Sequence, residues 1–231
     1  MSTPAARTAV NGRALRGDGA ATRARMLDAV VDCILENGYY EASSNAIARH
    51  AGVTWGAIQH QFGTRQALLL ALLEDRWHRL TDRIASTEVT GTTLEARLSC
   101  VMGALEEHYG THEYLVFTQV MLDLLQSPAS SAATKRAVAA HGRNLTRVWR
   151  PLFAKALGEA SKSDELVHYA FLAIRGYLSA NTMAASLVPQ RPDTATRALL
   201  LRGVACAIRE RAAEAGIDIG DPEPALAAGP T

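Results

Sequence analysis

Between residues 43 and 62 the sequence places polar side chains where two short helices would begin. Thr54 can cap the second helix, which leaves the first-turn N–H groups unpaired and gives that end a partial positive charge. Such an end suits DNA phosphates and base edges, because a short helix can enter the major groove by its N-terminus. The segment therefore predicts hydrogen bonding to DNA rather than catalysis of a bond-making step.

Individual side chains of this segment have distinct expected roles. Trp55 and Gly56 would open the second helix, and Trp55 could touch a thymine methyl or stack along a sugar. The alternative for Trp55 is packing against the neighbouring helix. Gln59 can donate to a phosphate oxygen or reach an adenine edge with two hydrogen bonds. His60 is expected to contact a phosphate, with an ordinary surface position as its alternative. The side chains expected to hold a flanking phosphate at the start of the first helix are Ser43 and Asn45.

The residues around the turn favour a close crossing of the two helices. Gly52 can take the positive φ angle that a tight turn requires. Small and apolar residues flank it at helical spacing, so that each helix has one face for the other. The crossing faces would come from Ile47, Ala48 and Ala51 on the first helix and from Val53, Ile58 and Phe62 on the second.

With its surroundings, this segment resembles the TetR family of bacterial regulators. The resemblance covers about residues 22 to 74 at the family's spacing, whereas the rest of the chain matches only in the number and order of helices. The matching residues are Met26, Leu27, Val30, Val31, Gly38, Tyr39, Ala42, Ser43, Ile47, Ala48, Ala51, Gly52, Val53, Thr54, Gly56, Ala57, Ile58, Phe62, Ala67 and Leu68.

The resemblance implies a dimeric regulator that binds palindromic double-stranded DNA, with a ligand domain after the DNA-binding domain. It also implies that Arg65 contacts a phosphate, because it stands where the family has a lysine. Two positions depart from the family pattern. Gln59 replaces a usual tyrosine, and Ser44 replaces a usual apolar residue, so its hydroxyl could turn to the backbone or to DNA. These departures leave the motif intact and the operator sequence undetermined.

Helical spacing recurs along nearly the whole chain, so the expected fold class is all-α with about nine helices. The expected divisions are a disordered basic arm (1–20), a helix-turn-helix DNA-binding domain (21–66), a helical ligand-binding and dimerisation domain (67–216) and a disordered tail (217–231). Residues 67–86 would be a connecting helix. The arm holds several arginines and could follow phosphates or enter a minor groove, with a solvated tail as the alternative.

Two local expectations concern the helices of the larger domain. Pro151 lies inside an expected helix over residues 132–157 and should kink or divide it. Thr92 and Glu95 fit a capping box at the start of an expected helix over residues 93–109.

The expected helices Asp164–Leu187 and Asp193–Ala215 are apolar on more than one face. A helix that is apolar on two sides must be buried on two sides, so one face is expected to meet a second copy of the chain. Gly176 and Gly203 would allow the backbones to approach closely there. These two helices are therefore the predicted homodimer interface, as the family resemblance also implies.

Soft and aromatic residues in the middle helices are candidates for a ligand pocket, and ordinary core is the alternative for each. The resemblance, more than the spacing, favours a pocket for an apolar or amphipathic small molecule. Arg175, between apolar neighbours, is the candidate for an anionic head group or for an interface ion pair. The candidate ligand-binding residues are Met102, Leu105, Tyr109, Phe117, Met121, Trp149, Phe153, Arg175 and Tyr177.

Composition and net charge exclude several other classes of protein. The net charge of +1 excludes a generic polyanion binder, and 48% hydrophobic residues are ordinary for a globular protein. The longest apolar run, Ala67 to Leu73, is too short to cross a membrane, and a cytoplasmic location is expected. His108 and His112 could bind a metal only in one continuous helix, which Gly110 is expected to break.

The sequence therefore predicts no metal, no cofactor, no membrane partner and no enzyme. The preferred function is a repressor released from DNA by a small-molecule effector. The alternative is a DNA-binding helical dimer without a small ligand, regulated by a partner or by concentration.

Overall fold

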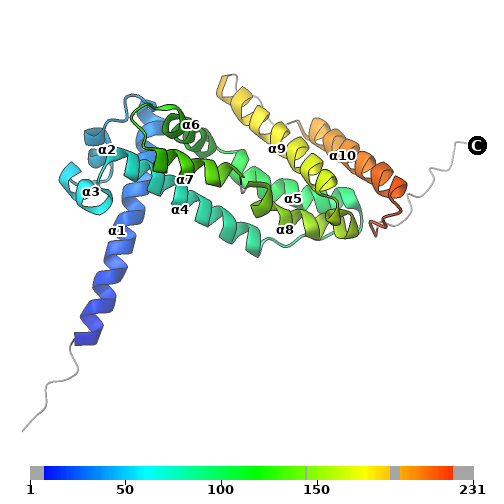
Figure 1. Cartoon of the computed structure of the whole chain (residues 1–231), viewed down its shortest axis with the longest axis horizontal. Helices are drawn as coiled ribbons and strands as arrows, with labels where there is room; N and C mark the ends of the chain where they lie inside the picture. Colours follow the sequence, from blue (N-terminus) through cyan, green and yellow to red (C-terminus); the bar gives the residue numbers. More distant parts are fainter. Residues whose placement is uncertain (1–7, 144, 188–192, 221–231) are drawn as a thin grey trace, which may run out of the picture. The chain divides into compact units, whose positions relative to one another are not determined.

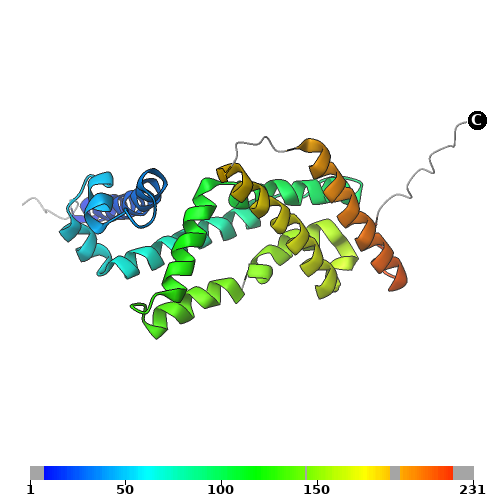
Figure 2. The same cartoon turned by 90° about the horizontal axis from the view of Figure 1, so that it is seen from above.

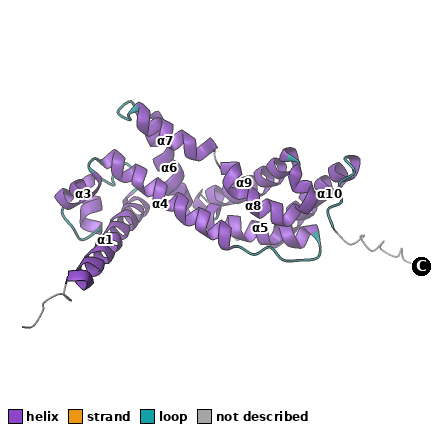
Figure 3. Cartoon of the chain, turned by 60° about the horizontal axis from the view of Figure 1, so that its bottom comes forward, coloured by secondary structure: helices purple, strands orange, loops and turns teal. Residues whose placement is uncertain are grey.

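The computed structural model describes residues 8–143, 145–187 and 193–220, and all of its secondary structure there is helical. Figure 3 shows helices joined by loops, with no strand among the described residues. Ten α-helices and one short 3-10 helix occur in this part of the chain, which confirms the all-α prediction. The chain divides into two compact units, here called unit 1 (residues 1–76 and 115–139) and unit 2 (residues 77–114 and 140–231).

Unit 1 contains the predicted helix-turn-helix segment. Its helices are α1 (Thr8–Asn37), α2 (Ser44–His50), α3 (Trp55–Phe62), the first half of α4 (Arg65–Ser86), most of α6 (His112–Gln126) and α7 (Ala132–Arg143) up to Ala139 (Figure 1). Their apolar faces form one core, in which Leu27, Ile47 and Ile58 are fully buried. Arg76 joins α4 to α1 through an ion pair of 2.8 Å with Asp28. The core and this pair hold α2 and α3 on a rigid support.

Unit 2 is a helical bundle with its own core. It contains α4 from Trp77 on, α5 (Leu94–Tyr109), α8 (Leu145–Leu157), the 3-10 helix η1 (Gly158–Lys162), α9 (Asp164–Leu187) and α10 (Thr194–Glu214). Figures 1 and 2 show α9 and α10 side by side. The guanidinium of Arg209 on α10 donates to both carboxylate oxygens of Glu95 on α5, at 2.6 and 2.5 Å. This pairing lowers the pKa of Glu95 and fastens α10 to α5.

The boundary between the units lies elsewhere than the sequence suggested. Residues 67–76 were expected in the ligand domain and belong instead to unit 1, together with most of α6 and α7. The reason is burial, because Leu68, Leu72 and Val120 share the core of α1 to α3. The helices that the sequence predicts to bind DNA, α2 and α3, are therefore part of a larger unit than the expected 21–66 domain.

The expected disordered ends are partly ordered. Residues 8–20 of the expected arm form the first turns of α1, since proline is absent after Pro4 and alanine, leucine and arginine favour helix. Residues 217–220 of the expected tail lie along unit 2, where Ile217 and Ile219 pack on the core and Arg97 donates to the carbonyl of Ile219 at 3.0 Å. Residues 1–7 and 221–231 lie outside the described residues.

Two local predictions concern Pro151 and the start of α5. Within the helix expected over 132–157 the structure describes α7 (Ala132–Arg143) and α8 (Leu145–Leu157), and Pro151, expected to kink or divide the helix, lies inside α8. Buried Trp149, Leu152 and Phe153 flank the proline, and their burial offsets the one intrahelical hydrogen bond that it forgoes. The cap of α5 is Thr93, not Thr92, and its hydroxyl accepts from the N–H of Ala96 at 3.2 Å.

Candidate nucleic-acid interface and ligand-binding residues

The α2–α3 segment is a helix-turn-helix with both helix starts capped. The hydroxyl of Ser43 accepts from the N–H of Ala46 at 3.3 Å, and that of Thr54 accepts from the N–H of Ala57 at 3.2 Å. Gly52 has a φ of +65° in the turn between the helices, which a residue with a side chain rarely adopts. Ile47 and Ile58 meet in the core at 0% exposure. The turn, the Thr54 cap and the crossing residues therefore have the predicted local geometry, and Ser43 is a cap that the sequence pattern did not predict.

One side of this motif presents polar groups to solvent. Of the residues predicted to contact DNA, three are partly buried, namely Ser44, Trp55 and Arg65, and the others are exposed. The exposed ones include Gly56 in the first turn of α3, and Gln59 and His60 in its second turn. An exposed helix start with polar side chains on one side is what major-groove docking requires. The exposed members of the predicted set are Ser43, Asn45, Thr54, Gly56, Gln59 and His60.

Trp55 combines two environments. Its side chain packs against the core of unit 1, yet part of it stays exposed at the start of α3. The packing that the sequence offered as the alternative is thus present for part of the indole. The contact of its exposed part with DNA remains a prediction.

Arg65 already has intramolecular partners at the start of α4. Its guanidinium donates to the carbonyl of Ala42 at 3.2 Å and lies 5.4 Å from the ring centre of Tyr39. Both contacts hold the side chain beside the start of α2, next to Ser43 and Ser44. A fixed guanidinium at this place suits a phosphate contact, because little side-chain freedom remains to be lost on binding.

Asp123, which no sequence pattern indicated, lies beside Arg65 and the start of α2. A pocket of about 380 Å³ is lined by Tyr39, Tyr40, Ala42, Ser43, Ser44, Arg65 and Asp123. Burial, and then the neighbouring Asp123, raise the pKa of Tyr39 to about 12. Asp123 comes from α6, more than 50 residues away along the chain, so no local pattern could have placed it there.

Near the turn, His50 on α2 pairs with Glu36 on α1 at 2.9 Å. The hydrogen bond to Glu36 raises the pKa of His50, which favours the charged imidazolium. The pair links α2 to α1 at the surface and leaves the exposed side of α3 unobstructed.

The predicted ligand-binding residues are not gathered in one pocket. Phe117 and Met121 pack on the core of unit 1, because α6 belongs to that unit from Leu115 on. The others lie in unit 2, where five of them are fully enclosed in its core: Met102, Leu105, Tyr109, Trp149 and Phe153. Ordinary core packing, the alternative that the sequence offered, therefore describes these five.

Three rings of this core, Tyr109, Trp149 and Phe171, form a group with His108 and Tyr114 that is here called the aromatic cluster. Trp149 donates from Nε1 to the Tyr109 hydroxyl at 3.1 Å, and the centres of these rings are 5.8 Å apart. Burial raises the pKa of Tyr109, and burial together with Arg83 and Arg175 lowers the pKa of His108 to about 4. At neutral pH His108 is therefore uncharged, and Arg175 is the cation in contact with the cluster.

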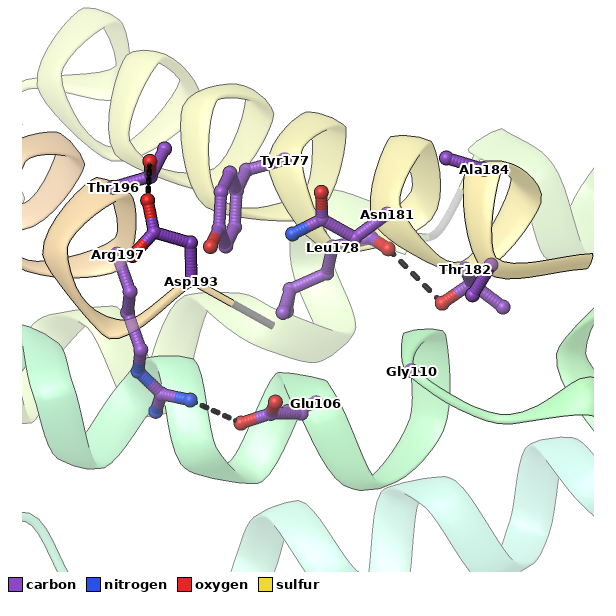
Figure 4. A pocket seen from close by; sticks show the side chains of 11 residues that line it. Glu106, Gly110, Tyr177, Leu178, Asn181, Thr182, Ala184, Asp193, Thr196 and Arg197 are labelled. Atoms are coloured by element: carbon purple, nitrogen blue, oxygen red, sulfur yellow. Dashed lines mark hydrogen bonds and ion pairs between the residues drawn. The ribbon is translucent and has the colours of Figure 1, made fainter. Parts of the chain in front are cut away.

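A cavity of unit 2 lies between α5, α9 and the start of α10. It has a volume of about 390 Å³, and Tyr177 is the predicted ligand residue that lines it. Figure 4 shows Arg197 reaching Glu106 across its floor, and Thr196 reaching Asp193. The Arg197–Glu106 pair is 2.5 Å long, so both of its charges are compensated within the cavity wall.

The outer faces of α9 and α10 expose apolar side chains. Tyr169, Leu172, Met183 and Leu187 are 41 to 86% exposed on α9, and Leu199 is 63% exposed on α10. Their positions on α9 follow helical spacing, while Phe171, Ile174 and Leu178 of the same helix are buried. Gly176 and Gly203 are exposed on these faces. Each helix thus buries one apolar face and leaves another uncovered.

The two histidines that might have shared a metal lie on different helices. Gly110 ends α5 and His112 begins α6, as the sequence predicted. Among the described residues, no group of three or more side chains could hold a metal ion. Nor does any helix in that part of the chain have the length and apolarity needed to cross a membrane.

This geometry defines a helix-turn-helix DNA-binding domain on a helical scaffold. The sequence model of the family described as "Bacterial regulatory proteins, tetR family" matches residues 26–72. The Fatty acid metabolism regulator protein of Bacillus subtilis is 29% identical over 107 residues, which are 45% of this chain and 53% of that protein. The HTH-type transcriptional regulator BetI of Escherichia coli K12 is 32% identical over 83 residues, covering 35% of this chain and 43% of that regulator.

Solved structures extend the similarity to the fold of most of the chain. A transcriptional regulator FadR from Bacillus subtilis in complex with stearoyl-CoA has a TM-score of 0.56 and 20% identity, covering 80% of this chain and 96% of the other. A putative transcriptional regulator from Pseudomonas aeruginosa PAO1 has a TM-score of 0.62 and 17% identity, covering 84% and 92%. At these identities the likeness concerns the fold.

Residues 26–72 of the chain are thus similar to the DNA-binding domain of the TetR family of bacterial regulatory proteins. The chain spans about half the length of the curated relatives it matches. Each relative named here is a regulator, in agreement with the prediction that the chain is not an enzyme.

Proposed function

We propose that this protein is a dimeric transcription regulator that binds palindromic DNA through α3 and is controlled by a small apolar or amphipathic molecule. The observation that carries the proposal is the capped and exposed start of α3 beside the fixed guanidinium of Arg65. The helix start would read base edges while Arg65 and the start of α2 hold the backbone. Repression is the expected direction of control.

The uncovered apolar faces of α9 and α10 support a twofold dimer. Exposed Leu172 and Met183 would be buried against the same faces of a second copy, and Gly176 and Gly203 would allow close packing. A twofold dimer places two copies of α3 roughly 34 to 36 Å apart, or a multiple of that distance, to match two half-sites.

The effector is proposed to bind in unit 2, near the rings that its core already gathers. The relative whose structure contains stearoyl-CoA supports a ligand with an apolar portion. To control DNA binding, the effector must bind two conformations of the dimer unequally. Several helices belong to both units, and among them α4, with its division at Arg76 and Trp77, follows directly on α3. It is therefore the expected route of control. The alternative is a dimer without an effector, whose occupancy of DNA follows concentration.

Fluorescence anisotropy on a duplex from the upstream region of the gene tests the DNA-binding part. Trp55→Ala should weaken binding to that duplex by at least tenfold while leaving binding to a scrambled duplex within about twofold. Because Trp55 also packs on the core, thermal unfolding must show that the variant is folded. Equal losses on both duplexes would mean that Trp55 serves packing alone, and no binding of the unaltered protein to either duplex would refute the proposal.

A further inference from the structure

Arg175 on α9 carries a charge that the described residues do not balance. Its guanidinium lies 5.4 Å from the ring centre of Tyr109 and 5.8 Å from that of Phe171. One Nη donates to the hydroxyl of Tyr114 at 3.4 Å, a long hydrogen bond. The Nε atom is buried and has no hydrogen-bond partner. Within the described residues no carboxylate lies within ion-pair distance of Arg175.

Three other arginines of unit 2 each form an ion pair with a carboxylate. Arg197 pairs with Glu106, Arg209 with Glu95 and Arg150 with Asp164. A cation enclosed among rings without a counter-ion is unfavourable, and rings offset only part of the cost. A bound anion would therefore supply the counter-ion that Arg175 lacks among the described residues.

The surroundings of Arg175 also indicate the chemical features of the anion. The guanidinium is planar and its Nη groups form a fork of donors, which matches the two oxygens of a carboxylate or a phosphate. The flanking groups are aromatic, so the rest of the molecule must be apolar. His108 adds no competing charge, because burial and the nearby Arg83 and Arg175 hold its pKa at about 4. Both Tyr114 and His108 are partly exposed, which leaves an approach from the surface of unit 2.

We propose that Arg175 is the anchor of the effector site and that the effector is an anion, a carboxylate or phosphate group on an apolar body that packs against the partly exposed rings of His108 and Tyr114. This rests on the proposed function, in that it gives the chemical class of the effector. It also replaces the dispersed set of ligand residues expected from the sequence with one local site in unit 2.

Isothermal titration calorimetry on the full chain tests the proposal with probes that differ only in the head group. Decanoate is compared with decanol, and 2-naphthoate with 2-naphthylmethanol, while decanoyl-CoA distinguishes a phosphate-bearing source of the charge from a free carboxylate. At least one of the anions should bind roughly tenfold or more tightly than its neutral partner, the effect expected of charge-assisted hydrogen bonds.

Three variants test whether Arg175 causes the difference in affinity between the anionic and the neutral probes. R175Q should reduce the affinity for the anion to that of the neutral probe, and R175K, which keeps the charge but loses the planar fork of donors, should fall between. The control R211Q removes an exposed arginine that pairs with Glu214 and should change nothing. Circular dichroism melts show whether each variant is folded, and R175K keeps the test usable if R175Q is not.

Three outcomes overturn the proposal: no anionic probe binds, anionic and neutral probes bind equally, or R175Q retains the affinity for the anion. Since calorimetry uses no DNA, these outcomes are independent of the anisotropy test. Failure of the anion site leaves the DNA-binding proposal standing, and the reverse also holds.

Discussion

The two units differ in whether their polar side chains are exposed and in whether those side chains have partners. In unit 1 the polar groups of the DNA-binding segment lie at exposed helix starts, and nearby backbone satisfies them, as at Ser43 and Thr54. In unit 2 the polar atoms of the aromatic cluster are enclosed among rings, and Arg175 is left without a counter-ion. An exposed and self-satisfied surface suits a large partner such as DNA, whereas an enclosed and incomplete one suits a small molecule.

The largest predicted difference between the units is in how their contributions to stability depend on pH. His108 in unit 2 has a folded-state pKa of about 4, against 6.5 in the unfolded chain. Between these values the unfolded chain binds the proton more readily, so the contribution of His108 is complete above pH 6.5 and is lost as the pH falls towards 4. The loss amounts to up to about 3 kcal/mol.

Urea unfolding from pH 7 to pH 4, with His108→Leu beside the unaltered chain, measures this loss. The variant should show a flatter dependence on pH. His50 in unit 1 has a raised pKa, so its smaller contribution is present at low pH and is lost as the pH rises. Parallel curves for His108→Leu and the unaltered chain would show that the imidazole titrates normally.

A matched pair of helix caps gives the next largest effect. Thr54 caps α3 in unit 1 and Thr93 caps α5 in unit 2, each accepting from the N–H three residues on at 3.2 Å. Replacing either by alanine should cost about 1 kcal/mol of stability, measured by denaturant unfolding. DNA affinity, however, should fall several-fold for Thr54→Ala alone. An equal loss of DNA affinity in Thr93→Ala would break the division of roles between the units.

The smallest expected effect concerns Asp123, whose carboxylate lies in the same pocket as Arg65. Arg65 is already held by Ala42 and Tyr39, so Asp123 is not needed to orient it and would instead repel a phosphate. Asp123→Asn should therefore tighten DNA binding by a few-fold, about 0.5 to 1 kcal/mol, and steepen its salt dependence. Glu88→Gln in unit 2 removes the same charge from an exposed site and is the control. Weaker binding by Asp123→Asn would make Asp123 a support for Arg65.

These differences between the units also explain what could be predicted from the sequence. Gly52, Thr54 and the crossing residues act within about 20 positions of one another, so their spacing carries the geometry. Asp123 and Tyr39, or Arg175 and Tyr114, meet only after distant helices pack, and no pattern of spacing reports such meetings.

The differences from the sequence-based expectations have a similar origin. Phe117 and Met121 have the residue types of a ligand pocket, but the division of α6 between the units packs them against the core of unit 1. Pro151 was expected to kink or divide a helix, and α8 continues through it, with its neighbours buried in the core of unit 2. In both cases tertiary packing overrode a correct local preference.

The central claim is that the exposed start of α3 reads a specific DNA sequence as part of a dimer. Selection of bound duplexes from a random 40-base-pair library tests it most directly, with Gln59→Ala selected in parallel. The account predicts enrichment of an inverted repeat by the unaltered chain and a change of preferred base within each half-site for Gln59→Ala. Recovery of no sequence above the input library would contradict it.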